Sequence, residues 1–107
     1  MLFRSSNRVF VSSVSFWEFA IKYNLNRLEL PNIDIHKIPV MCKAIGFEFF
    51  DLSPVDALES FRLSRKDGHR DPFDRMLIHL AIKHSYTLVT CDPKARLYGV
   101  DGLEYFW

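Results

Sequence analysis

Short apolar runs predict three strands. They are residues 8–11 (RVFV), 47–50 (FEFF) and 87–90 (TLVT), and polar or turn-forming residues border each run. Short runs rich in β-branched and aromatic side chains are typical of buried strands. Amphipathic stretches separate these runs, so the pattern predicts strands that alternate with helices. Such alternation indicates an α/β domain with a mostly parallel sheet and helices on both faces.

The stretches between the strands have the apolar spacing of helices. We expect helices over residues 13–23, 34–46, 53 to about 63, and 71–84. Ser12 or Ser13 is the expected cap of the first helix. A short turn or helix is expected over 93–97, followed by a tail over 103–107. Pro39 either starts the second helix or splits it in two, and Gly46 is a stop signal. The expected core-facing positions are Val14, Trp17, Ala20 and Ile21 in the first helix and Phe73, Met76, Leu77, Leu80 and Ala81 in the last.

Length and composition limit this protein to one domain. The chain has 107 residues, of which 49% are apolar, and this excludes a disordered or low-complexity protein. Its net charge is +1, so only a local patch could hold a nucleic acid. No apolar run is long enough for a membrane span, and no signal peptide is evident. Cys42 and Cys91 have no CxxC spacing, so we expect reduced thiols and a cytoplasmic location.

Acidic residues from distant parts of the chain are expected to meet at one edge of the sheet. In a parallel sheet, the residues after a strand and the first turns of the helices lie at the carboxyl edge. Asp92 follows the strand 87–90, Asp71 and Asp74 open the preceding helix, and Glu18 lies one to two turns into the first helix. We therefore expect Glu18, Asp74 and Asp92 to converge.

Such a convergence of carboxylates favours a bound cation. Two carboxylates about 4 Å apart repel by about 4 kcal/mol at an effective dielectric of about 20, so either one is protonated or a cation lies between them. Oxygen ligands suit Mg²⁺ or Mn²⁺ better than zinc. An ion of this kind leaves room for a phosphate, lowers the pKa of a bound water and stabilises a phosphodiester transition state.

Each acid also has a purely structural interpretation. Asp71 and Asp74 fit a helix cap and an acid at the third helical position. Glu18 stands three residues after Ser15 and could belong to a capping box, and Asp92 fits an ordinary turn start. Only the joint placement of the acids at one edge favours the metal hypothesis.

Three segments carry a family resemblance. They are residues 12–22 (SSVSFWEFAIK), 69–78 (HRDPFDRMLI) and 88–93 (LVTCDP). In order and spacing they resemble the signatures of the PIN domain, most closely its VapC-type toxin branch. The resemblance implies a single PIN-like domain over residues 1–107, with a three-layer α/β/α fold. It also implies an endoribonuclease that depends on Mg²⁺ or Mn²⁺, usually the toxin of a toxin–antitoxin pair.

The resemblance also implies roles for individual residues. Glu18, Asp74 and Asp92 correspond to the second, third and fourth acids of the family, as catalytic groups and metal ligands. Asp71 would either bind the metal through water or only cap its helix. The side chains expected to support the ligands by hydrogen bonds are Thr90 and Ser15.

Basic residues near the acids are candidates for contact with RNA phosphates. They are Arg70, Arg75 and Lys22. The structural alternatives are a solvated helix end with its loop and, for Lys22, a surface lysine whose stem covers apolar atoms. The partners implied by the resemblance are an RNA substrate, a cognate antitoxin and a second copy in a homodimer, with no membrane.

One part of the family pattern has no counterpart here. PIN domains begin with a central strand that ends in an acid, usually a principal metal ligand, and a helix follows it. Nothing in residues 1–7 is acidic. We therefore expect an N-terminally truncated domain that lacks this strand and helix, with exposed strand edges and weak or absent activity. The alternative to a ribonuclease is a catalytically inactive remnant that binds an antitoxin or its own copy. A third hypothesis, a receiver-like phosphoacceptor, is disfavoured by the order of the motifs.

Overall fold

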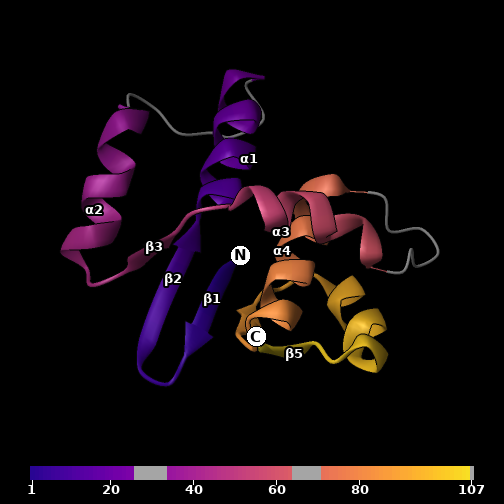
Figure 1. Ribbon diagram of the computed structural model, residues 1–107. Helices are drawn as coiled ribbons and strands as arrows, with labels where there is room; N and C mark the ends of the chain where they lie inside the picture. The colour runs from indigo at the N-terminus through magenta and orange to yellow at the C-terminus, as the bar shows by residue number, and fades with distance from the viewer. Residues whose placement is uncertain (26–33, 64–70, 107) are drawn as a thin grey trace.

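The computed structural model describes residues 1–25, 34–63 and 71–106 (Figure 1). Helices flank a five-stranded sheet of order β3-β2-β1-β4-β5. The strands are β1 (Leu2–Ser5), β2 (Arg8–Ser12), β3 (Glu48–Phe50), β4 (Thr87–Val89) and β5 (Glu104–Phe106). The pairs β2–β3 and β4–β5 are parallel, whereas β1 is antiparallel to both β2 and β4. Four strands therefore point the same way, which confirms the predicted α/β fold with a mostly parallel sheet.

The helices lie close to the predicted stretches. They are α1 (Ser13–Asn24), α2 (Ile38–Ala44), α3 (Pro54–Glu59) and α4 (Pro72–Lys83), with 3₁₀ segments η1 (Ile35–Lys37), η2 (Ser60–Arg62) and η3 (Pro93–Asp101). Side chains of Ser12, Ser53 and Asp71 cap α1, α3 and α4 by accepting hydrogen bonds from first-turn N–H groups. Pro39 lies in the first turn of α2 and starts that helix, and Gly46 follows its end at a φ of 97°. No helix in the described part of the chain could cross a bilayer.

The sequence pattern does not predict β1, which occupies the centre of the sheet. Phe3 on this strand pairs with Phe10 of β2 and with Leu88 of β4. A two-residue turn joins β1 to β2, and Ser6 in it adopts a positive φ of 53°. Because β1 pairs on both sides, the inner edges of β2 and β4 are covered. The expectation of exposed strand edges at this place is therefore wrong.

The core lies where the sheet meets α4. Phe3, Phe10 and Leu88 form one row across the sheet and share a buried cluster with Leu77 and Leu80 of α4. The predicted stripe on α4 is confirmed, because its second half is buried and its first half packs against the same cluster. The hydrophobic core thus fixes α4, and with it the acids at its start, against the central strands.

The predicted stripe on α1 is only partly buried. Val14 is buried, but Trp17 is 59% exposed and Ile21 is 37% exposed. The helix follows β2 directly, and its later turns extend beyond the end of the sheet (Figure 1). Helical spacing correctly predicts a shared face, yet the sheet is too short to cover all of it.

The region after β4 is more regular than predicted. The expected turn over 93–97 is a longer 3₁₀ segment, η3, and the expected tail contains the edge strand β5. Tyr98 and Leu103 are buried in the core from this region. Residue 107 lies outside the described residues.

Candidate metal centre

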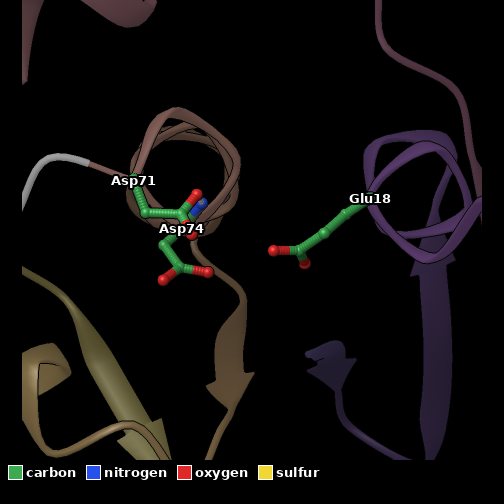
Figure 2. A group of neighbouring side chains, drawn as sticks. All are labelled: Glu18, Asp71 and Asp74. Atoms are coloured by element: carbon green, nitrogen blue, oxygen red, sulfur yellow. Dashed lines mark hydrogen bonds between the residues drawn. The ribbon is translucent and has the colours of Figure 1, made fainter. Parts of the chain in front are cut away.

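Three carboxylates from two helices come together at the carboxyl end of the parallel strands. Figure 2 shows Glu18 extending from α1 toward Asp71 and Asp74 at the start of α4. One carboxylate oxygen of each residue lies within 4.8 Å of the other two. All three side chains are half-buried. The packing of α1 against α4 thus brings together acids more than fifty positions apart in the chain.

The start of α4 holds two of these acids. Asp71 Oδ1 accepts hydrogen bonds from the N–H groups of Phe73 at 2.9 Å and Asp74 at 3.2 Å. Asp71 is therefore the helix cap, as its structural interpretation proposed, and Asp74 lies in the first turn. A helix N-terminus favours negative charge, so it stabilises both carboxylates. Capping uses one oxygen of Asp71 and is compatible with a metal contact through the other.

Glu18 reaches the cluster from the second turn of α1. The capping-box interpretation of this residue is wrong, because Ser12 rather than Ser15 caps the helix. Lys22 Nζ lies 3.4 Å from Glu18 Oε2, one turn further along. Ser15 Oγ donates a hydrogen bond to the carbonyl of Met1 at 3.2 Å, so it ties the start of β1 to α1.

Asp92 lies outside the three-acid group but lines the same cleft. Thr90 is buried after β4, and its Oγ1 accepts a hydrogen bond from the Asp92 N–H at 3.1 Å. Asp92 Oδ1 in turn accepts from the Lys94 N–H at 2.9 Å and begins η3. The structure thus supports the turn-start interpretation of Asp92. It shares the lining of the cleft with the acids of α1 and α4.

The cleft that joins these residues has a volume of about 410 Å³. Its lining residues in the described part of the chain are Met1, Glu18, Lys22, Asp71, Asp74, Val89, Thr90, Cys91 and Asp92. Four carboxylate side chains and the Lys22 side chain therefore belong to its described lining. A cation between the carboxylates would remove much of their mutual repulsion.

The basic residues predicted to contact RNA have different positions. Lys22 lines the cleft. Arg75 does not: its Nη2 donates to the carbonyl of Leu63 at 2.8 Å, and its side chain lines a separate pocket beside Phe61. Arg70 falls within residues 64–70, outside the described residues.

Sequence reasoning did not single out two residues of the cleft. Cys91 is exposed there, and its place between Thr90 and Asp92 was the available signal. Met1 gave no signal, because it reaches the cleft only through the antiparallel direction of β1.

A comparison with protein-family models matches residues 2–101 to the PIN domain. The chain belongs to the PIN domain family. The match runs from β1 to the end of η3, so it includes every acid of the cleft. Comparisons of this PIN domain with curated proteins and with solved structures gave no significant match.

The clustered acids of this PIN domain fit a divalent cation. They offer carboxylate oxygens, which are the ligands preferred by Mg²⁺ and Mn²⁺. Two ligands on opposite sides of one Mg²⁺ ion lie about 4.2 Å apart. Oxygens within 4.8 Å of one another therefore need only small side-chain rotations to share an ion.

Proposed function

We propose that this PIN domain is an endoribonuclease that hydrolyses RNA phosphodiester bonds with Mg²⁺ or Mn²⁺ held by Glu18, Asp71 and Asp74. The observation that carries the proposal is the convergence of these carboxylates in one half-buried cleft. A divalent cation bound there would supply positive charge beside the scissile phosphate and lower the pKa of a nearby water.

The remaining residues of the cleft suit the other tasks of hydrolysis. Asp92 lines the cleft together with the clustered acids, and Thr90 Oγ1 accepts a hydrogen bond from its N–H. We assign Asp92 to orienting the attacking water, with Thr90 as its positioning residue. Lys22 lines the cleft beside Glu18 and offers an ammonium group for a substrate phosphate. Ser15 supports the cleft indirectly, through Met1.

The proposed activity is weak, because β1 brings Met1 and not an acid to the cleft. By the family resemblance, a PIN domain has a further acid on a central strand, and this chain has none in residues 1–7. Among the described residues, the three clustered acids would hold the cation. The same observation favours the second candidate function, a catalytically inactive PIN remnant that serves as an interaction module.

Within the family we propose the VapC-type toxin branch. Support comes from the three segments around Glu18, Asp74 and Asp92, which resemble the signatures of that branch. On this proposal the protein is a single cytoplasmic domain over residues 1–107. It pairs with its own copy and is neutralised by a cognate antitoxin.

A cleavage assay tests the nuclease proposal. We expect the wild-type protein with Mn²⁺ to cut structured RNA, and Asp74→Asn to lose more than about tenfold in rate, since even residues that only support metal ligands have effects of this size. Asp51→Asn removes an exposed acid that does not line the cleft and should cleave like the wild type. Equal cleavage by Asp74→Asn and the wild type would remove Asp74 from the mechanism.

Calorimetric titration with Mn²⁺ separates the two candidate functions. Binding of Mn²⁺ by the wild type but not by Asp74→Asn, together with cleavage, supports the nuclease. Absence of both binding and cleavage favours the remnant.

A further inference from the structure

A large aromatic side chain stands beside the acidic cleft with most of its surface in water. Trp17 directly precedes Glu18 on α1 and is 59% exposed. Its ring contacts Phe73 at the start of α4 edge-to-face, with centroids 4.9 Å apart and planes at 88°. The remaining surface of the indole is open to a ligand.

A groove lined by Phe73 of this pair, and not by Trp17, shares part of its wall with the acidic cleft. Its volume is about 270 Å³, and its described lining residues are Glu18, Ile21, Lys22, Leu25, Asp71, Pro72 and Phe73. Glu18, Lys22 and Asp71 also line the acidic cleft, so the two hollows adjoin each other. The groove is therefore apolar along α1 and Phe73 and charged where it meets the cleft.

We propose that Trp17 and Phe73 form a stacking platform for one nucleobase of the RNA, next to the phosphate held at the acids. This inference rests on the proposed function and adds the part of the site that binds a base. Single-stranded RNA is commonly recognised by stacking its bases on aromatic side chains, and every base offers a π-face. Lys22, at the junction, is placed to pair with the backbone phosphate between the base and the acids.

The size and charge of the groove favour a base over a protein segment. About 270 Å³ lies just below the usual range of small-molecule sites, roughly 300–1,000 Å³, and suits one planar group. Its described walls combine exposed apolar side chains, Ile21 and Leu25, with the Lys22 ammonium and the Glu18 and Asp71 carboxylates at the end shared with the cleft. A nucleotide divides in a matching way: its flat base suits the apolar walls, and its phosphate suits Lys22 and a cation held by the carboxylates.

Intrinsic fluorescence can test this directly, because the chain has two tryptophans. In a Trp107→Phe background Trp17 is the remaining tryptophan. The probes are a mixed-sequence 12-nucleotide single-stranded RNA and an abasic ribose-phosphate oligomer of equal length, both in Ca²⁺ buffer. We expect the RNA to quench Trp17 fluorescence and the abasic oligomer to leave it unchanged.

Affinity measurements with variants complete the test. Trp17→Ala should weaken binding of the RNA about fivefold or more and leave the abasic oligomer unaffected, whereas Trp17→Phe should stay within about twofold of the parent. Phe61→Ala is the matched control: Phe61 is 78% exposed and lines a separate pocket with Arg75. Thermal melts of each variant confirm that it is folded, and the quenching experiment does not depend on the alanine variant.

Several results would overturn the platform. They are an unquenched Trp17, an unchanged RNA affinity in folded Trp17→Ala, or an equal loss for RNA and abasic oligomer. Self-association weakened by Trp17→Ala with unchanged RNA affinity would instead make the groove a protein interface.

Failure of the platform is distinguishable from failure of the nuclease. If Asp74→Asn abolishes cleavage and Trp17→Ala has no effect, only the platform fails; if Trp17 is quenched but the wild type does not cleave, only the nuclease fails.

Discussion

Asp56 is a buried acid that the metal cleft does not use. Its carboxylate accepts hydrogen bonds from Lys83 Nζ at 2.6 Å and from His84 Nε2 at 3.0 Å, and Lys83 also contacts Glu59. Burial by itself would raise the pKa of Asp56, but the hydrogen bonds and charges of Lys83 and His84 outweigh it and hold the pKa below its usual range. This cluster fastens α3 to the far end of α4, away from the acids at its start.

The lowered pKa of Asp56 makes its contribution to stability pH-dependent. Because the folded-state pKa lies below the unfolded value of about 3.9, the contribution is complete above that value and is lost as the pH falls through the folded-state pKa. We expect Asp56→Asn to lower the free energy of unfolding by about 2 kcal/mol at pH 7. The difference from the wild type should shrink as the pH falls below about 3.9.

Urea titrations at pH 7 and pH 3 provide the measurement. Asp51→Asn, an exposed acid next to β3, should match the wild type at both values. If Asp56→Asn destabilised the protein equally at both pH values, the size and shape of the Asp56 side chain, and not its negative charge, would be what stabilises the packing of α3.

At the scale of the elements, local signals predict the helices and the start of the site. Ser53 and Asp71 cap α3 and α4 at the positions that their sequences indicate. The meeting of Glu18 with the acids of α4 follows from the common direction of two strands, β2, which leads into α1, and β4, which follows α4. The exposure of Trp17 could not be predicted in this way, because helical spacing says which residues share a face and not how far the sheet extends beneath it.

Asp71 caps α4, and the proposed function adds a second role as a metal ligand. Two substitutions separate these roles. Asn caps a helix as well as Asp does, whereas Ala does not. Both substitutions remove the charge, so the difference between Asp71→Asn and Asp71→Ala isolates the cap. We expect Asp71→Ala to be less stable than Asp71→Asn by about 1 kcal/mol in EDTA.

Both variants should bind Mn²⁺ more weakly than the wild type, and to the same extent, in calorimetric titrations. Ser53→Ala, which removes the cap of α3, should lose a similar amount of stability and keep the Mn²⁺ affinity. Wild-type Mn²⁺ affinity in Asp71→Asn would show that this residue only caps its helix.

At the scale of the molecule, the sheet depends on a strand that no local signal marks. β1 has four residues, and its pairing with β2 and β4 is antiparallel. Its stability comes from partners elsewhere in the chain: Phe3 contacts the rings of Phe50 and Tyr86 and lies between Phe10 and Leu88. Such contacts exist only in the assembled core, so hydrophobic patterning within residues 1–7 could not predict them.

The central position of β1 makes Phe3 decisive for the whole fold. Phe3 is 1% exposed and Phe106, on the edge strand β5, is 57% exposed. We expect Phe3→Ala to lower the free energy of unfolding by about 3–5 kcal/mol, the usual cost of removing a buried phenylalanine side chain. Phe106→Ala should cost under about 1 kcal/mol, because it loses little more than a cation–π contact with Arg4 at 5.3 Å. Urea denaturation measures both, and amide exchange should find β1 better protected than β5 in the wild type. Similar small losses of unfolding free energy in the two variants would mean that residues 2–5 do not fold into the middle of the sheet. The neighbouring strands would then need a different arrangement, and so would the cleft at their carboxyl ends.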